Sequence, residues 1–246
     1  MSMFLLAIAV SFTATFIGSV SGGSTSVITL PCWLSFGFPL PTAVAADKTA
    51  GALWTAVASR NYLRGKQLDW PLILGLSGFG IIGAVLGTRV TVSVDPQLLK
   101  RVVGGIILTV VAIYWVKKEF GLETTAPAVG RFTCSIFGFP LGFYEGILGS
   151  GNSLISSLTL CKSRGFDLLT SLGHSYLVAF AWCAAAAIAY SGQGFFNWSL
   201  TIPAIIGSVL GAQTGSMLGS RMGAKPVKIL FSVAGVFFGG KLLLGL

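Results

Sequence analysis

Near the N-terminus, two apolar segments are separated by Gly18-Ser19-Val20-Ser21-Gly22-Gly23-Ser24-Thr25-Ser26. A similar stretch, Gly146-Ile147-Leu148-Gly149-Ser150-Gly151-Asn152-Ser153, occurs 128 positions later in the chain. Both are rich in glycine and small polar residues, which are weak helix formers. Within a hydrocarbon layer, a break of this composition is tolerated only where it is buried in protein or lines a cavity. The two stretches therefore predict a binding site inside a membrane.

The composition indicates a membrane protein. Hydrophobic residues make up 54% of the 246 positions and charged residues only 9%, whereas soluble domains carry about 25% charged residues. The longest apolar segments, of about 18 to 24 residues, match helical spans rather than the short alternating strands of a barrel. The first segment lacks the basic start of a signal peptide, so we expect a retained helix. The chain is predicted to be an all-α, polytopic, multi-pass membrane protein.

Charge and cysteine usage exclude several classes of protein. The net charge of +9 comes mainly from short loops between apolar segments, which bears on topology rather than on nucleic-acid binding. The four cysteines show no CxxC spacing, and the chain has one histidine. We therefore expect the cysteines to pack in the core, and we expect no metal and no cofactor. No Ser-His-Asp arrangement or phosphate loop supports an enzyme.

The chain shows an internal duplication. Ile81-Ile82-Gly83-Ala84-Val85-Leu86-Gly87 recurs as Ile205-Ile206-Gly207-Ser208-Val209-Leu210-Gly211. The second apolar segment of each half is too short to cross a membrane in one piece, which needs about 17 residues. We expect two repeats, residues 1–120 and 121–246, of about five helical segments each, including half-helices after the breaks. The ten segments are Met3–Val20, Val27–Phe38, Thr42–Tyr62, Trp70–Val92, Leu98–Val116, Phe132–Leu148, Leu154–Cys161, Leu168–Tyr190, Trp198–Leu218 and Val227–Leu246.

Basic residues predict the orientation of the two halves. Cytoplasmic loops of membrane proteins carry an excess of Lys and Arg. In the two halves these residues cluster at ends that are not equivalent in the repeat, so the repeats are predicted to be inverted, with an odd number of crossings each. The positions are Arg60, Arg64, Lys66, Lys117 and Lys118 in the first half, and Lys162, Arg164, Arg221, Lys225 and Lys228 in the second. The exceptions are Arg89, Lys100 and Arg101, which this topology leaves on the outside.

The segments after the breaks predict an anion site. Each opens with hydroxyl or amide side chains of the kind that cap helices. A helix that begins there directs unpaired N–H groups and the positive end of its dipole into the gap, which attracts an anion. The candidate binding residues at the breaks are Gly22, Gly23, Ser24, Thr25, Gly151, Asn152 and Ser153.

Four further residues are candidates for the same site. Lys48 lies about seven residues inside the third segment, at a depth of roughly 10 Å, where ionisable residues are costly and usually functional. Tyr176 stands 128 positions after Lys48, preceded by His174 and Ser175. Lys48 would supply charge to the anion, and the other three would complete its shell. The alternatives are that Lys48 snorkels to an interface and that His174 is a neutral hydrogen-bond partner.

Three residues are candidates for proton coupling. Asp47 precedes Lys48, and Glu145 lies in an apolar run just before the second break. Burial favours the protonated form of a carboxyl group. His174 can carry a proton near neutral pH. The alternative for Glu145 is a structural hydrogen bond to the broken backbone.

The chain resembles the TauE/SafE sulfite exporter family, also called the toluene sulfonate uptake permease family. The resemblance rests on the first helix running into a glycine-rich break, from Gly18 to Pro31, and on the Gly-x-x-Leu-Gly run of each half. The first break departs from the usual pattern because it reads Gly22-Gly23-Ser24, where the family has a longer glycine run. The resemblance implies transport of sulfite, sulfonates or related organic anions across a bacterial inner membrane.

We therefore expect a secondary transporter that exports sulfite or a related anion by alternating access between the inverted repeats. Its expected partners are a small anion, protons as a candidate coupled ion, and membrane lipids, with no nucleic acid; a homodimer is compatible with the sequence. The alternatives are an organosulfonate, thiosulfate or sulfide permease, an anion channel, and a non-transporting membrane subunit or lipid-modifying enzyme. A thiosulfate or sulfide permease that contacts the sulfur of its substrate through cysteine needs a cysteine at a break. Cys32 and Cys161 lie some eight residues beyond the breaks, so we rank this alternative lower.

Overall fold

The computed structural model describes residues 2–23, 25–93 and 124–223, with isolated positions between 95 and 112 and between 225 and 240. The regular elements of this part of the chain are helices, which confirms the all-α prediction. The fifth segments predicted for each half, Leu98–Val116 and Val227–Leu246, lie largely outside it. The helices are α1 (Ser2–Ser21), α2 (Ser26–Ser35), α3 (Leu40–Leu63), α4 (Trp70–Ser93), α6 (Arg131–Ile136), α7 (Gly138–Ile147), α8 (Asn152–Arg164), α9 (Leu168–Gly192) and α10 (Trp198–Met222).

The helices fall into two length classes. Among the described residues, four helices are long and apolar enough to cross a membrane: α1, α4, α9 and α10. In contrast, α2 has 10 residues and α8 has 13, so they extend roughly 15 to 20 Å, against a hydrocarbon core of about 30 Å. The helices after the two breaks are therefore short, as the sequence predicts.

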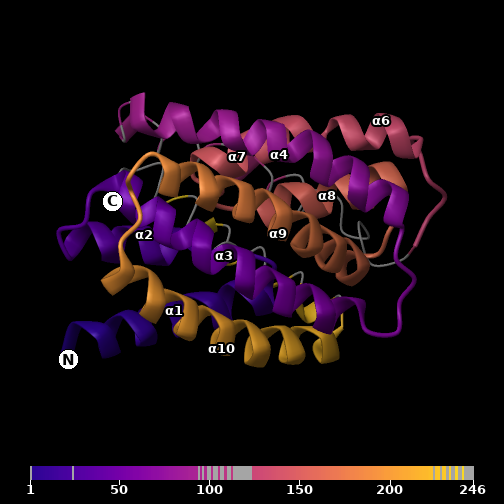
Figure 1. The fold of residues 1–246 in the computed structure, drawn as a ribbon. Coiled ribbons are helices and arrows are strands. Elements are labelled where there is room, and N and C mark those ends of the chain that lie inside the picture. The colour runs from indigo at the N-terminus through magenta and orange to yellow at the C-terminus, as the bar shows by residue number, and fades with distance from the viewer. Residues whose placement is uncertain are drawn as a thin grey trace.

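The helices pack so that the two halves interlock (Figure 1). The first helix of the first half, α1, packs along α10, while α7 of the second half packs along α4. Helices α3 and α9 lie between these two pairs and contact each other extensively. The fourth segment of each half, α4 or α10, therefore packs against the first segment of the other half.

The repeated glycine run explains these two contacts. A Cβ atom at Gly83 of α4 would lie 2.2 Å from the carbonyl oxygen of Phe139 in α7. At Gly207 of α10, the equivalent position, a Cβ atom would lie 2.3 Å from the carbonyl oxygen of Ile8 in α1. Small residues let helix backbones approach each other closely in membranes. The same sequence motif therefore serves the same packing role in both halves.

The backbone is interrupted where the sequence predicts it. Gly22 in the first break has φ +71°, and Gly149 and Gly151 in the second have φ +66° and +78°. L-residues with a Cβ rarely adopt this left-handed conformation. One further interruption was not predicted: the segment Phe132–Leu148 is divided into α6 and α7 at Phe137.

Basic residues collect at one end of the bundle. Arg60 lies in the last turn of α3, and Arg64 and Lys66 follow its end. Together with Arg221 of α10 they surround one hollow. At the same end, Arg131 and Arg164 contact Asp69 and Lys66 contacts Asp167, with N–O distances of 2.9, 3.6 and 3.4 Å. Arg89, near the other end of α4, is an exception, but the excess at one end is typical of the cytoplasmic face of a membrane protein.

Candidate functional site

The N-terminal ends of α2 and α8 meet at a small buried cavity between the two halves. The cavity has a volume of about 20 Å³, which is enough for about one water molecule. Its lining includes Thr25 from the start of α2, Ser153 from the first turn of α8, and Lys48 from α3. Two helix N-termini and one cationic side chain therefore face the same enclosed space.

The cavity is lined by equivalent positions of the two halves. Three pairs of lining residues are separated by 128 positions, the offset that relates the two breaks. The pairs are Thr25 and Ser153, Gly51 and Ala179, and Thr55 and Cys183. The cavity thus lies where positions related by this offset in the two halves of the sequence meet.

Lys48 is buried and fully engaged at this cavity. Only 2% of the Lys48 surface is exposed. The ammonium donates a hydrogen bond to Oε1 of Glu145 at 2.6 Å and another to the carbonyl oxygen of Leu148 at 3.0 Å. Lys48 therefore connects α3 of the first half to the end of α7 in the second, and it does not snorkel to an interface.

Glu145 is the partner that neutralises Lys48. Its second oxygen, Oε2, accepts a hydrogen bond from Nδ2 of Asn152 at 2.7 Å, and Oε1 accepts one from Sγ of Cys183 at 3.3 Å. A buried charge without a partner is strongly destabilising, whereas a paired and hydrogen-bonded one is tolerated. Nearby, Asp47 accepts a hydrogen bond from the hydroxyl of Thr29 at 2.7 Å. The positive charge at the cavity is thus matched by carboxylates.

Two buried tyrosines hold the helix ends beside the breaks. The hydroxyl of Tyr62 donates to the carbonyl oxygen of Ser19 at 2.7 Å, and that of Tyr190 donates to the carbonyl oxygen of Gly146 at 2.8 Å. The last carbonyl groups of a helix have no partner within the helix and need one from elsewhere. Since the two tyrosines are 128 positions apart, they fix α1 and α7 in the same way.

Known proteins resemble this chain over most of its length. The family model described as sulfite exporter TauE/SafE matches residues 7–242. The chain belongs to the TauE/SafE family. A "Probable membrane transporter protein" of Haemophilus influenzae is 27% identical over 204 residues, covering 82% of this chain and 80% of that protein. "Probable membrane transporter protein ORF9" of Sinorhizobium sp is 26% identical over 234 residues, covering 95% and 89%.

A third relative, "Probable membrane transporter protein YdhB" of Bacillus subtilis, is 24% identical over 216 residues, or 85% of this chain and 84% of that protein. No solved structure matches the chain. The family and these relatives identify the chain as a membrane transporter protein.

In this TauE/SafE protein, only part of the predicted site is assembled around the cavity. Thr25, Lys48 and Ser153 line it, together with the proton-coupling candidates Asp47 and Glu145. Gly22 and Gly23 lie buried in the first break, and Gly151 immediately precedes α8. Ser24 lies outside the described residues.

Three predicted residues lie elsewhere. Nε2 of His174 accepts a hydrogen bond from the backbone N–H of Asp69 at 3.3 Å, near the basic end of the bundle. The hydroxyls of Ser175 and Ser157 are hydrogen-bonded at 3.3 Å, and Tyr176 donates to the carbonyl oxygen of Gly18 at 3.3 Å. None of the three lines the cavity. Tyr176 occupies the position equivalent to Lys48 by the 128-residue spacing, but its hydroxyl contacts the backbone of α1 instead of the cavity.

The expected side-chain caps are absent at both helix starts. The Thr25 side chain makes no cap hydrogen bond to α2, and the residue that precedes α8 is Gly151 rather than a hydroxyl or amide residue. Asn152 directs its amide to Glu145 and to the carbonyl oxygen of Leu141 instead. The prediction of capping was therefore wrong for these side chains. Neither N-cap residue, Thr25 nor Gly151, therefore caps its helix through a side-chain hydrogen bond.

Sequence reasoning did not select seven of the lining residues, among them Thr55 and Cys183; the others are Ser26, Gly51, Trp54, Gly149 and Ala179. Thr55 lies seven positions after Lys48, and Gly51 lies three after it. Residues at this spacing share one face of a helix, so the face that carries Lys48 also carries Gly51 and Thr55. Adding the repeat offset to Thr55 would have led to Cys183.

Proposed function

We propose that this protein is a secondary transporter that moves sulfite or a related small sulfur-containing or organic anion out of the cell across the bacterial inner membrane. One observation carries the proposal: the N-termini of α2 and α8 and the ammonium of Lys48 meet at one cavity between the halves. Backbone N–H groups and a buried cation suit the oxygens of such an anion. The name of the matching family supports the choice of substrate.

Glu145 makes anion binding conditional on a proton. While Glu145 is ionised, its carboxylate occupies Lys48 at 2.6 Å and repels a second anion. When Glu145 binds a proton, Lys48 is left without this counter-ion, and a substrate oxygen can take its place. The other titratable side chains around it are Asp47 on α3, Cys183 on α9 and Tyr144 on α7. Anion and proton are thus expected to bind together.

Transport requires the cavity to open. At about 20 Å³ the cavity has room for about one water molecule, so an anion of four heavy atoms does not fit this closed form. Rocking of one inverted repeat against the other would open the cavity to each side in turn. The Lys48–Glu145 ion pair joins the two halves in the closed form.

The proposal is tested by sulfite flux in proteoliposomes, with and without a pH gradient. We expect saturable flux that Lys48→Ala abolishes. Glu145→Gln is expected to retain sulfite binding but to lose the response to the pH gradient. Lys162→Ala is the matched control because Lys162 is an exposed lysine at the end of α8. Flux that does not saturate would indicate an anion channel, and flux unaffected by Lys48→Ala in a folded protein would refute the site.

A thiosulfate permease is a second candidate because Cys183 lies at the cavity. Its thiol is 3.3 Å from Oε1 of Glu145, where it would meet the substrate. If transport depends on a transient contact between this thiol and the sulfur of the substrate, Cys183→Ser abolishes thiosulfate flux. Cys134→Ser is the control and should leave flux unchanged. Cys134 is also buried, and it is hydrogen-bonded to Ser163. Unchanged flux in Cys183→Ser would remove this candidate.

A further inference from the structure

The two carboxylates at the cavity have different partners. Asp47 and Glu145 both line it, but only Glu145 forms an ion pair with Lys48. Asp47 is 8% exposed, yet it has no ion pair with any described residue. With both carboxylates ionised and Lys48 protonated, the side chains that line the cavity carry a net charge of −1.

Lys48 does not neutralise Asp47, although the two residues are adjacent. Successive side chains of a helix point about 100° apart. Lys48 reaches the second half of the protein, where its ammonium donates to Glu145 and to the carbonyl oxygen of Leu148. Asp47 instead faces α2, where its Oδ1 accepts a hydrogen bond from the hydroxyl of Thr29 at 2.7 Å. The charge of Asp47 therefore needs another partner.

The second oxygen of Asp47 shows what that partner is. Oδ2 of Asp47 has no hydrogen-bond partner. A proton on Oδ2 would remove the charge, but its O–H group would have no acceptor. Nε1 of Trp33 on α2 is also unpaired, but an N–H group would leave the negative charge in place. Buried charges are paired or bind a metal ion, and a cation at Oδ2 satisfies both the charge and the lone pairs.

The surroundings of Asp47 suit a small monovalent cation. Hydroxyl groups of Thr25, Ser26, Thr55 and Ser153 belong to the lining of the same cavity. Carboxylate and hydroxyl oxygens are ligands of hard cations, and transporters hold Na⁺ beside broken helices. One unmatched negative charge requires one positive charge. The volume of about 20 Å³ suits Na⁺ without its hydration shell better than the larger K⁺.

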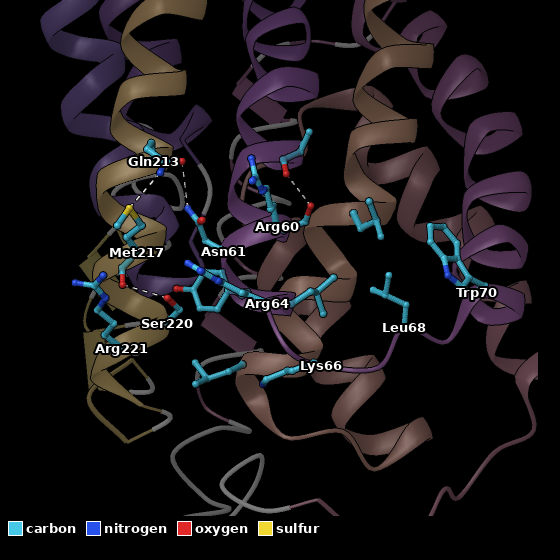
Figure 2. A pocket seen from close by; sticks show the side chains of 16 residues that line it. Arg60, Asn61, Arg64, Lys66, Leu68, Trp70, Gln213, Met217, Ser220 and Arg221 are labelled. Atoms are coloured by element: carbon cyan, nitrogen blue, oxygen red, sulfur yellow. Dashed lines mark hydrogen bonds between the residues drawn. The ribbon is translucent and has the colours of Figure 1, made fainter.

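The other described carboxylates outside the cavity have no need of a metal ion. Asp69 and Asp167 form ion pairs with basic side chains, and Asp95 is exposed. Figure 2 shows that arginine and lysine side chains surround the large hollow at the basic end of the bundle, and no acidic residue is among its described lining. A specific effect of Na⁺ is therefore expected at Asp47.

We propose that Asp47 binds Na⁺ at the cavity, together with hydroxyl oxygens of the lining. The bound ion makes the cavity neutral while Glu145 is ionised. When Glu145 takes up a proton, the lining and the ion carry a net charge of +1, whereas without Na⁺ the cavity would only become neutral. Na⁺ thus supplies the positive charge that a bound anion needs. This last step rests on the function proposed above, whereas Na⁺ binding does not.

The test is thermal unfolding of the detergent-solubilised protein in NaCl and in choline chloride of equal ionic strength. Chloride is the same in both salts, so effects of the anion cancel. At a hundred times its dissociation constant, a ligand raises the unfolding midpoint of a chain of this length by roughly 5–10 °C. We expect a saturable rise of this size in NaCl and little or none in KCl. Equal midpoints in NaCl and choline chloride would overturn the proposal.

Two pairs of variants locate the ion. Asp47→Asn keeps the size of the side chain but removes its charge, so the rise in NaCl should disappear, while the control Asp95→Asn should keep it. A full rise in Asp47→Asn would overturn the proposal. If Asp47→Asn does not fold, binding of radiolabelled Na⁺ decides. It should be about tenfold weaker in Thr25→Val and unchanged in Thr13→Val, an exposed position of α1; equal binding by these two variants would overturn the proposal.

Sulfite binding tests the step that rests on transport. A unit charge close to a buried anion changes its affinity by about tenfold or more, so wild-type protein should bind sulfite at least tenfold more weakly when choline replaces Na⁺. Equal sulfite affinity in the two salts would overturn this step. Absence of sulfite flux, with the rise in NaCl intact, would overturn only the proposed transport.

Discussion

The close contact between α4 and α7 allows a sharp prediction for Gly83→Ala. The added Cβ would lie 2.2 Å from the carbonyl oxygen of Phe139 and 2.6 Å from the backbone nitrogen of Phe143, whereas ordinary contact begins at 3.4 Å. The neighbouring atoms belong to the backbone, so no side-chain rotation relieves the overlap, and the helices must separate by about 1 Å. Overpacking of this kind costs about 1–3 kcal/mol and occasionally more.

For a chain of this length, each kcal/mol shifts the unfolding midpoint by roughly 2–4 °C. A backbone clash belongs at the upper end of the range, so Gly83→Ala should lower the midpoint by about 6–12 °C in detergent-solubilised protein. The equivalent variant Gly207→Ala, whose Cβ would lie 2.3 Å from the carbonyl oxygen of Ile8, should show a similar loss. Flux should fall in both variants because α4 and α10 join the two halves.

Gly78→Ala provides the control in the same helix. A Cβ at Gly78 meets nothing within 4 Å, and alanine is the better helix former by about 1 kcal/mol. The midpoint should therefore stay the same or rise slightly. If Gly83→Ala and Gly78→Ala unfold at the same temperature, the close packing of α4 on α7 is refuted.

Two other predictions concern polar contacts. Burial opposes ionisation of Asp167, the N-cap residue of α9, but hydrogen bonds from Thr170 and the charge of Lys66 outweigh it and lower its pKa below the usual 3.8. The stability that the ionised Asp167 contributes is therefore complete above pH 3.8. It is lost as the pH falls through the lower pKa of the folded protein. Asp167→Ala should lower the free energy of unfolding by about 1 kcal/mol at pH 7. In thermal unfolding at acid pH, the difference between the variant and the wild type should shrink. A difference that does not change with pH would contradict the capping role of ionised Asp167. Tyr62→Phe and Tyr190→Phe each leave a buried carbonyl oxygen without its hydrogen-bond donor, at a cost of about 1–3 kcal/mol. We expect faster amide hydrogen exchange at the adjoining break in each variant. Unchanged exchange in both variants would contradict the anchoring role of the tyrosines.

Periodic and compositional signals predicted the elements of the fold well. Apolar runs located the long helices, and the shortness of the runs after the breaks predicted α2 and α8. The division at Phe137 was missed because only the hydropathy of the segment Phe132–Leu148 was considered. The sequence carries a signal for it: Pro140 has no N–H to donate to the carbonyl oxygen of Ile136, and its ring crowds that carbonyl. Gly138, beside the division, also packs closely against α4, where an added Cβ would lie 2.4 Å from the carbonyl oxygen of Leu76.

The candidate site was only partly predictable for a different reason. Depth within a segment identified Lys48, and the repeat offset related Thr25 to Ser153. Depth alone also selected His174, but the direction of a side chain around the helix axis decides which space it faces. His174 faces the loop at Asp69, whereas Cys183, which no polar pattern marks, faces the cavity. Helical spacing from Lys48 is the sequence signal that carries this directional information.

The magnitudes also decide which feature controls anion binding. A helix N-terminus contributes about 0.3–1 kcal/mol to an anion nearby, and up to about 2 kcal/mol when partly buried. Separating a buried ion pair such as Lys48 and Glu145 costs about 3–5 kcal/mol. The two N-termini together therefore do not offset the removal of an ionised Glu145 from Lys48. Under the function proposed above, an anion would therefore reach Lys48 only when a proton has replaced the charge of Glu145, and the ion pair, rather than the helix dipoles, would set the coupling between anion and proton.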